Sequence, residues 1–347
     1  MTQRVKLGLI GCGGIARSAH LPAMATLLDR VELVCTADVD AAAAQAAAAP
    51  WGAAHSTDYR AVLARKDIEA VVIATPEYLH CEQVEAAAAA GKHILCEKPM
   101  AQSVAEADRM IAAAARAGVH LLIGHSRRFT RRYMEIRAAV DRGDIGTVRL
   151  MRENERRPRM KSGEQVWWTP KHWTGNPNVS QGVAMLNAIH EADLLRWFIG
   201  AEARTVYAES AVTIEGNVGV PDFLSLTVTF ANGAIGSAEV VNAAPPGYPA
   251  FHQMELYGTE GAIRAKDHEL IGLTRFTDTG ADFPATFEML LHNKTAYVRE
   301  LAELVGAIRE ARPVCTPATE ARAALTIALA AQESARTHRV IEMGAAA

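Results

Sequence analysis

A short apolar strand, a glycine-rich turn and a helix follow one another at the start of the chain. Residues 5–10 are the apolar run, residues 11–16 read GCGGIA, and a second apolar run at 32–37 ends at Asp38. A strand, a helix and a second strand in this order are typical of a parallel sheet that is covered by helices. The start of the chain therefore predicts an α/β domain.

The glycine-rich turn matches the dinucleotide-binding fingerprint GxGxxA, and it lies between a strand and a helix as that fingerprint requires. Gly11 makes the tight turn, Gly13 lets a pyrophosphate approach the backbone, and the small Ala16 permits close packing of helix on strand. Gly14 and Ile15 begin the helix, whose free N–H groups and positive dipole end favour phosphate. These residues predict a bound dinucleotide.

Asp38 indicates which dinucleotide is bound. Its carboxylate can accept hydrogen bonds from both ribose hydroxyls of NAD, but it would face the 2′-phosphate of NADP. Two like charges about 4 Å apart at an effective dielectric near 20 cost on the order of 4 kcal/mol. Val39, Asp40 and a run of alanines follow, with no arginine to offset that repulsion. We therefore predict NAD rather than NADP, and we assign Asp40 to the cap of the next helix.

The alternation of strand and helix continues as far as residue 123. An apolar strand at 68–74 leads into Thr75 and Pro76, with His80 five residues further on. In parallel sheets, ligands bind outside the carboxyl ends of the strands, so these three residues are predicted to line the cofactor cleft.

The next strand, at 93–96, ends in Glu97, Lys98 and Pro99. A lysine at the carboxyl end of a buried strand is placed for chemistry, although a surface lysine in a turn would give the same pattern. We predict that Glu97 and Lys98 lie at the cofactor site and that the Lys98–Pro99 peptide bond is cis.

Three segments together resemble the Gfo/Idh/MocA (glucose-fructose oxidoreductase, inositol dehydrogenase) family of nicotinamide-dependent oxidoreductases. They are GCGGIA at 11–16, ATP at 74–76 with His80, and GKHILCEKP at 91–99, and the resemblance spans essentially the whole chain. It implies that Lys98 sits beside the nicotinamide and the substrate. It also implies that the second domain is an open, mostly antiparallel sheet that makes oligomer contacts.

The second half of the sequence fits an α+β domain. Residues 223–230 alternate apolar and polar side chains, and Asn232-Gly233 is a strong hairpin signal before a strand at 234–242. We predict a Rossmann domain at 1–123 and a substrate-binding and oligomerisation domain at 124–347. A broad sheet with helices on one face needs its other face covered, which favours a homodimer or homotetramer.

A helical segment at 186–197 carries polar side chains at Asn187, His190 and Asp193, three residues apart and so on one side of the helix. A histidine among apolar neighbours is more often a core residue than a catalyst. The resemblance reverses this preference, because members similar in this region place a substrate-contacting histidine here. It therefore implies that His190 is the catalytic acid/base. Relatives like inositol dehydrogenase carry an aspartate where this chain has Leu186; Asn187 could replace it, or Asp193 could orient the imidazole.

A tryptophan-rich segment at 167–173 follows a group of arginines, and it is open to two interpretations. It could be a substrate wall with stacking and anion-binding groups, or a solvated strand edge with an oligomer contact. The predicted substrate-binding residues are Lys98, Arg128, Arg156, Trp168, His172, Trp173 and His190. No metal site is expected, because nothing supplies a third or fourth ligand beside His190 and Asp193.

Composition limits the remaining possibilities. The 347 residues are too many for one ordinary core, and a net charge of −3 gives no basic excess for nucleic acid. No signal peptide or membrane span is expected, and five scattered cysteines favour a reducing cytoplasm. We predict an NAD-dependent oxidoreductase that acts on a secondary alcohol or ketone of a sugar, cyclic polyol or related small molecule. The alternatives are an NAD-dependent glycosidase acting by transient oxidation and a non-catalytic nucleotide-bound sensor.

Overall fold

The computed structural model describes residues 4–158, 161–162, 165–166, 174, 176, 179–213, 219–244, 248, 250–266, 273–277, 280–282 and 292–344. The chain divides into two compact units. Unit 1 consists of Met1–Thr130 and Leu291–Arg322, and unit 2 of Arg131–Leu290 and Ala323–Ala347. The predicted domain boundary after residue 123 remains a prediction. Unit 1 also includes the segment Leu291–Arg322, which lies near the end of the chain.

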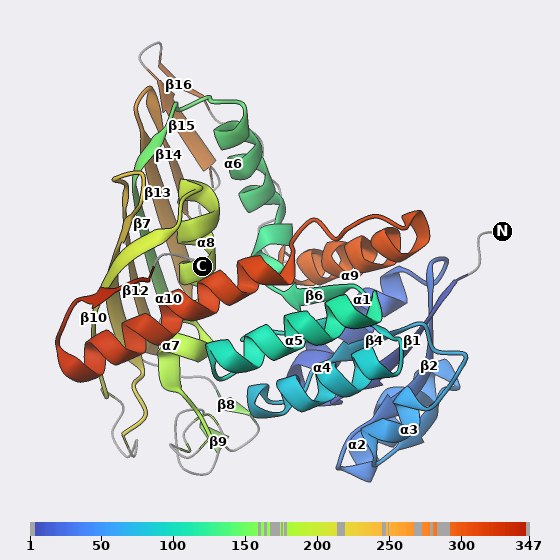
Figure 1. The fold of residues 1–347 in the computed structure, drawn as a ribbon. Helices are drawn as coiled ribbons and strands as arrows, with labels where there is room; N and C mark the ends of the chain where they lie inside the picture. Colours follow the sequence, from blue (N-terminus) through green and yellow to red (C-terminus); the bar gives the residue numbers. More distant parts are fainter. Residues whose placement is uncertain are drawn as a thin grey trace. The chain divides into compact units, whose positions relative to one another are not determined.

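Unit 1 is built on a six-stranded parallel sheet in the order β3-β2-β1-β4-β5-β6. This is the strand order of the dinucleotide-binding Rossmann fold, so the predicted fold class is confirmed. Figure 1 labels the strands β1, β2, β4 and β6 of this sheet. The strands are β1 (Val5–Ile10), β2 (Val31–Ala37), β3 (Ala54–Ser56), β4 (Ala70–Ile73), β5 (His93–Glu97) and β6 (Leu121–Gly124). Their side chains are buried on both faces in β1, β4, β5 and β6, which explains why these strands are continuous apolar runs in the sequence.

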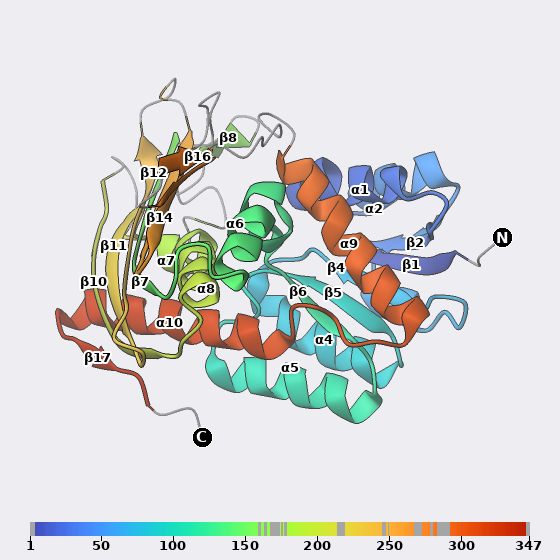
Figure 2. The same ribbon diagram turned by 90° about the horizontal axis from the view of Figure 1, so that it is seen from above.

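Helices cover both faces of this sheet, with α1 and α9 on one side and α4 and α5 on the other (Figure 2). The apolar core on the first side joins Leu7 and Leu9 of β1 to Met24 of α1 and to Leu301 and Leu304 of α9. The helical elements of unit 1 are η1 (Ala16–His20), α1 (Leu21–Thr26), α2 (Ala41–Ala48), η2 (Ala49–Trp51), α3 (Tyr59–Leu63), η3 (Glu77–Leu79), α4 (His80–Ala89), α5 (Val104–Ala117), η4 (Ser126–Phe129) and α9 (His292–Glu310).

Unit 2 is built on a nine-stranded sheet in the order β16-β15-β14-β13-β7-β12-β11-β10-β17. Among the described pairings within this nine-stranded sheet, only β7–β12 is parallel, which confirms the predicted mostly antiparallel sheet. The strands are β7 (Val148–Pro158), β10 (Ala203–Ala211), β11 (Phe223–Phe230), β12 (Ile235–Ala244), β13 (Phe251–Gly258), β14 (Gly261–Lys266), β15 (Leu273–Thr277), β16 (Gly280–Asp282) and β17 (Ile341–Glu342); β8 (Lys161–Ser162) and β9 (Gln165–Val166) form a separate pair.

One face of the nine-stranded sheet packs against helices. They are α6 (Arg131–Asp141), α7 (Gly182–Leu186), α8 (Ala188–Ile199) and α10 (Ala318–Thr337), of which residues 323–337 belong to unit 2. The hairpin predicted at Asn232-Gly233 joins β11 to β12, and the side chain of Asn232 accepts a hydrogen bond from the Ala234 N–H at 3.1 Å. This hairpin keeps alternate residues of β12 against α8, which positions the polar residues described below.

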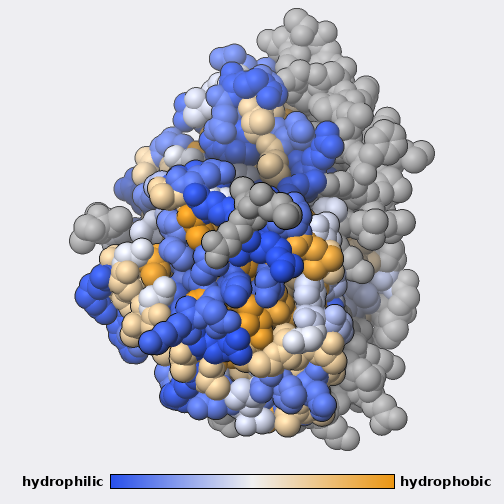
Figure 3. Space-filling view, turned by 90° about the vertical axis from the view of Figure 1, so that its right-hand side faces the viewer, coloured by the Kyte–Doolittle hydropathy of each residue, from blue (hydrophilic) through white to orange (hydrophobic). Residues whose placement is uncertain are grey.

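The surface face in Figure 3 is mostly hydrophilic (blue), with small separate hydrophobic areas (orange) between the polar side chains. Single exposed apolar residues of this kind are normal on protein surfaces. Among the described residues, no helix combines the length and the apolar character needed to cross a membrane.

Candidate active site

The glycine-rich turn of unit 1 has the geometry that its sequence predicts. Gly11 has φ +89°, and a Cβ at this position would lie 2.6 Å from the carbonyl oxygen of Ala74. Only glycine fits where the turn passes so close to the end of β4. At Gly13 and Gly14, an added Cβ would meet none of the described atoms within 4 Å. The backbone is therefore open where a pyrophosphate would approach it.

Asp38 lies at the end of β2 and is tied to the same turn. One carboxylate oxygen accepts a hydrogen bond from the Cys12 N–H at 2.7 Å, and the other accepts from the Asp40 N–H at 2.9 Å. Asp40 caps α2 by accepting from Ala42 and Ala43, as the sequence suggested. The carboxylate of Asp38 is thus held at the carboxyl edge of the sheet, and its remaining lone pairs suit ribose hydroxyls.

Gly11, Thr75 and Lys98 come shortly after three adjacent strands, β1, β4 and β5. Because the carboxyl ends of parallel strands meet at one edge of the sheet, the predicted cofactor residues of unit 1 gather there.

His80 joins two of these loops. Its ring nitrogens lie 2.9 Å from the carbonyl oxygens of Thr75 and Pro99, and its side chain is buried. Burial lowers the pKa of His80 although both carbonyls favour the charged form. A neutral imidazole donates to only one of the two carbonyls. His80 therefore braces the Thr75-Pro76 loop against the lysine that precedes Pro99.

The elbow at Glu97, Lys98 and Pro99 contains a cis Lys98–Pro99 bond, which confirms the sequence prediction. Glu97 is 5% exposed, accepts from the Lys98 N–H at 3.2 Å and lies 2.8 Å from Nε2 of His20. Burial alone would raise the pKa of Glu97, but its hydrogen bond with His20 and the charge of His20 outweigh burial and lower it. Glu97 is therefore an ionised carboxylate at the base of the elbow.

Glu77 lies near the Lys98 side chain and was missed by the sequence analysis. It is 3% exposed at the start of η3, directly after Pro76. Burial raises the pKa of Glu77, while the positive charge of Lys98 opposes that rise. Lys98 is half-buried and interacts electrostatically with both Glu77 and Glu97. The position of Glu77, next to the Thr75-Pro76 pair, is the signal that could have identified it.

The segment predicted as one helix at 186–197 is two helices, so that prediction was wrong at Asn187. Helix α7 ends at Leu186, and α8 begins at Ala188. Asn187 has φ −129° and ψ −56°, and its Oδ1 accepts from Asn242 Nδ2 on β12 at 2.7 Å. The side chain bonds to a neighbouring strand, and asparagine is poorly suited to a helix interior.

His190 and Asp193 both lie on α8, and both are buried in unit 2, at 7% and 1% exposed. The backbone N–H of His190 donates to the carbonyl oxygen of Asn187 at 2.9 Å, so the helix break fixes the first turn of α8. Asn242, which the sequence analysis missed, is 3% exposed, and its Oδ1 has no hydrogen-bond partner among the described residues. Asn187 and Asn242 thus form a neutral amide pair, and its member Asn187 lies three residues before His190 in the chain.

The two arginines predicted to bind substrate have partners within their own units. Arg128, on η4 of unit 1, pairs with Glu320 at 3.4 Å. Arg156, on β7 of unit 2, pairs with Glu239 of β12, on the sheet face opposite the buried side chains of these strands. Trp168, His172 and Trp173 lie outside the described residues. The substrate role of all five remains a prediction.

A second polar cluster lies in the core of unit 2. Glu153, Glu191 and His252 are buried, and their potential ligand atoms lie within 4.8 Å of one another. The Nδ1 atom of His252 is 2.7 Å from the Tyr133 hydroxyl, and Nε2 is 3.0 Å from Glu153. Both ring nitrogens are engaged, so the arrangement is a tyrosine–histidine–glutamate hydrogen-bond chain that joins α6, β13 and β7.

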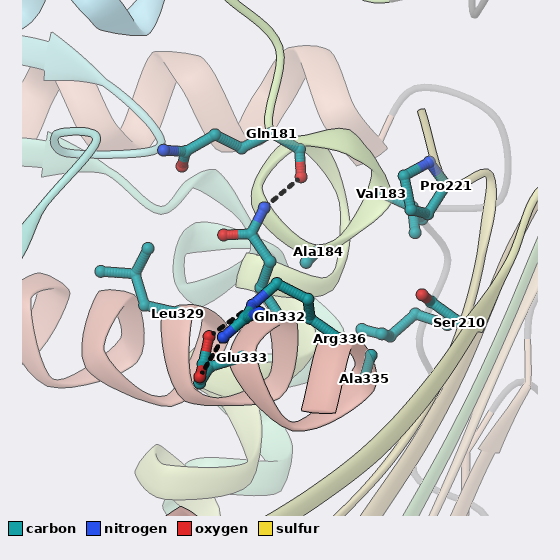
Figure 4. A pocket seen from close by; sticks show the side chains of 11 residues that line it. Gln181, Val183, Ala184, Ser210, Pro221, Leu329, Gln332, Glu333, Ala335 and Arg336 are labelled. Carbon is teal, nitrogen blue, oxygen red and sulfur yellow. Dashed lines mark hydrogen bonds and ion pairs between the residues drawn. The ribbon is translucent and has the colours of Figure 1, made fainter. Parts of the chain in front are cut away.

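A cavity of about 610 Å³ lies in unit 2 between α7, α10 and the strands β10 and β11 (Figure 4). Gln332 donates to the carbonyl oxygen of Gln181 at 3.1 Å across it, and Arg336 pairs with Glu333 at its rim. Val183, Leu224 and Leu329 are among its apolar lining residues. None of the predicted site residues that the structure describes lines this cavity.

Two family models match the chain. Residues 5–125 match an oxidoreductase family described as an NAD-binding Rossmann fold, and residues 133–264 match a GFO/IDH/MocA C-terminal domain.

Similar proteins extend over nearly the full length. Inositol 2-dehydrogenase of Rhizobium meliloti (strain 1021) is 30% identical over 341 residues, covering 98% of this chain and 99% of its own. The oxidoreductase YrbE of Bacillus subtilis (strain 168) is 30% identical, covering 96% and 95%. A solved levoglucosan dehydrogenase, in complex with NADH and levoglucosan, is 25% identical with a TM-score of 0.87, covering 99% and 100%.

Proposed function

The chain belongs to the Gfo/Idh/MocA family of NAD-binding oxidoreductases, and we propose that it interconverts a secondary alcohol and a ketone on a sugar or cyclic polyol. The observation that carries this proposal is the edge of the six-stranded sheet. There the open turn at Gly11 to Gly14, the carboxylate of Asp38 and the elbow at Lys98 all follow strand ends of one sheet. The names of relatives support the substrate class, since they include an inositol dehydrogenase and a levoglucosan dehydrogenase.

The residues at this edge fit NAD. The open backbone at Gly13 and Gly14 would take the pyrophosphate, and Asp38 would take the adenosine ribose. Ile15, Thr75, Pro76 and His80 would line the remainder of the cofactor site. When bound, NAD supplies the hydride acceptor that alcohol oxidation requires.

We assign the acid/base chemistry to His190 and Lys98. His190 takes the proton of the substrate hydroxyl as the C–H bond breaks, and Lys98 donates a hydrogen bond to the same oxygen as negative charge develops on it. Imidazole suits this task because both of its protonation states are accessible near neutral pH. Asn187 and Asp193 orient the imidazole. In this proposal the neutral amide pair of Asn187 and Asn242 takes the place of the aspartate that the family resemblance leads us to expect at the position of Leu186.

A substrate panel tests the function. Sugars, inositols, uronates and aromatic diols are each incubated with the enzyme and NAD, and NADH is followed by its absorbance. Net NADH formation with a member of the sugar or polyol group supports the proposal. Cleavage of a glycoside without net NADH would establish the glycosidase alternative, and binding without turnover across the panel would establish the sensor.

Cofactor choice gives the first quantitative prediction. Because Asp38 is held facing the ribose site, NAD should bind at least about tenfold tighter than NADP, a difference of about 1.4 kcal/mol. Replacement of Asp38 with serine should reduce this preference, since it removes the repulsion of the 2′-phosphate. Isothermal titration calorimetry of both cofactors measures the ratio.

Asp40 supplies the matched control for that experiment. It is an aspartate two residues further on, and it caps α2. Asp40→Asn keeps a capping side chain and should leave the NAD to NADP ratio unchanged. Equal affinities of the unmodified protein for both cofactors would remove Asp38 from the cofactor site.

We further propose that the protein is a cytoplasmic homodimer or homotetramer. The outer face of the nine-stranded sheet carries Ile235, Leu150 and Tyr257 side by side on β12, β7 and β13. Ile235 is 44% exposed and Tyr257 41%, so a second copy would cover apolar side chains in this position. All five cysteines are free thiols, which supports a reducing compartment.

A further inference from the structure

Three titratable side chains lie buried together inside unit 1, beneath the elbow that carries Lys98. They are His20 of η1, Glu97 of β5 and Glu300 of α9, and they are 1%, 5% and 0% exposed. Each comes from a different element, and their sequence positions are far apart. Charged groups are rarely buried to this degree without a partner, so the charge state of this cluster needs an explanation.

Two of the three side chains form a pair. His20 Nε2 lies 2.8 Å from Glu97 Oε1, and the ring of Tyr297 packs edge-on against the imidazole at 5.2 Å between centroids. The second oxygen of Glu97 accepts from the Lys98 N–H. Both oxygens of Glu97 are therefore engaged, one with a histidine and one with the elbow. This arrangement stabilises Glu97 as an anion.

Glu300 has a different environment. Neither of its carboxyl oxygens has a hydrogen-bond partner among the described residues. Burial, and then the negative charge of Glu97, raise the pKa of Glu300 well above its usual value.

The elements of unit 1 that pack most extensively against α9 are α1, η1, η4 and β5. Arg128 is paired with Glu320, and Arg299 of α9 donates to the Phe129 carbonyl. The titratable groups on those elements are Arg17 and His20 on η1, His93, Cys96 and Glu97 on β5, and Arg127 and Arg128 on η4, with none on α1. Two neighbouring buried carboxyls in such surroundings hold one proton between them, and the member without a hydrogen-bonded partner holds it.

We propose that Glu300 is a positioning residue that stays a neutral carboxylic acid and leaves Glu97 as the ionised member of the pair beneath Lys98. An ionised Glu300 would place a second negative charge beside Glu97 and change the electrostatic field at the lysine. The pair thereby sets the charge that faces the catalytic ammonium group from within the sheet. The catalytic part of this inference rests on the function proposed above, whereas the protonation of Glu300 does not.

Stability as a function of pH tests the protonation without any substrate. In the folded protein Glu300 keeps its proton, but in the unfolded chain it ionises above about pH 4.3. Folding stability should therefore fall as the pH rises from about 5 until the folded group ionises. Glu300→Gln fixes the neutral form. The ratio of the unfolding constant of the unmodified protein to that of Glu300→Gln should rise by up to about tenfold per pH unit in this range. Urea unfolding at several pH values measures it.

Glu303 is the matched control, one turn further along α9. Hydrogen bonds from Arg312 lower the pKa of Glu303, so its contribution to stability should be lost as the pH falls, which is the opposite sign. Infrared difference spectra give a direct second measurement, because a protonated carboxylic acid has its own C=O stretching band. That band should be present at neutral pH and absent in Glu300→Gln. A constant stability ratio together with no such band would overturn the proposal.

The positioning role has its own readout. Glu300→Gln is compared with the unmodified enzyme in the pH dependence of turnover. At alkaline pH it should hold its activity beyond the point at which the unmodified enzyme begins to lose it, because glutamine does not ionise. Identical alkaline limits in both proteins would show that Glu300 has no influence on Lys98. Failure to find any dehydrogenase substrate would leave the stability and infrared results standing, so the two failures are distinguishable.

Discussion

Replacement of His190 with alanine should lower turnover by about a hundredfold or more and leave NAD affinity nearly unchanged. The imidazole takes the substrate proton in the proposed reaction, whereas the residues assigned to cofactor binding all lie in unit 1. Alcohol oxidation should also speed up with rising pH through the range in which imidazole titrates, because only the neutral ring accepts a proton. This rising limb of the pH–rate profile should disappear in the His190→Ala variant. Steady-state kinetics across pH, with NAD binding measured separately, gives both results.

His338 is a suitable comparison for this experiment. It lies in unit 2, is exposed and pairs with Glu209 on the surface. His338→Ala should leave turnover and the pH profile unchanged, since an exposed pair of this kind contributes little. Near-normal turnover and an unaltered pH limb in His190→Ala would make His190 a packing residue. The base would then have to be sought at Lys98 or His172.

Replacement of Lys98 with methionine should cause a loss similar to that of His190→Ala. Methionine keeps much of the length and apolar stem of lysine but removes both a hydrogen-bond donor and a positive charge from the oxygen that becomes an alkoxide. In the proposed reaction both side chains act on one oxygen in one transition state, so the losses in a double variant should not add. Turnover of the two single variants and the double variant measures this coupling. Full additivity would place the two residues at separate steps.

Lys92 offers a matched control, because it immediately precedes β5 whereas Lys98 immediately follows that strand. It is 6% exposed, and its ammonium group donates to the carbonyl oxygens of Arg65 and Ile68 at 2.8 Å. Lys92→Met should lower stability, because two buried carbonyls lose their donor. Turnover per folded molecule should nevertheless stay near that of the unmodified enzyme. A comparable loss of turnover in Lys92→Met would mean that the Lys98 result reports folding rather than chemistry.

The cofactor half of the site could be predicted from sequence because it depends on local order along the chain. Gly11, Thr75 and Lys98 each come shortly after an apolar strand, and parallel strands bring their carboxyl ends together in a known way. The predicted bounds of β1 and β11 also match the structure, because their apolar patterns are strong.

Contacts between distant segments could not be predicted in this way. The break at Asn187 depends on Asn242, which is 55 residues away, and helical periodicity alone cannot reveal a partner on another strand. The carboxyl of Glu300 faces a buried glutamate about two hundred positions earlier in the chain, and in the sequence it reads as an ordinary helix residue. Such pairs become visible only when the packing of the elements is known.

Helix α9 has a consequence for how the protein can be made. Its residues Leu301 and Leu304 complete the core of a unit whose first strand is formed by Val5–Ile10. A ribosome synthesises the chain from its N-terminus, so the nucleotide-binding unit cannot complete its core until nearly three hundred residues have been made and α9 emerges. Until then, the face of the sheet that α9 covers stays open to chaperones and to other nascent chains. A protein fragment ending at residue 123 would leave that face of the sheet exposed permanently. A circular permutant that joins α9 directly to β1 would shorten the delay between the synthesis of these two elements.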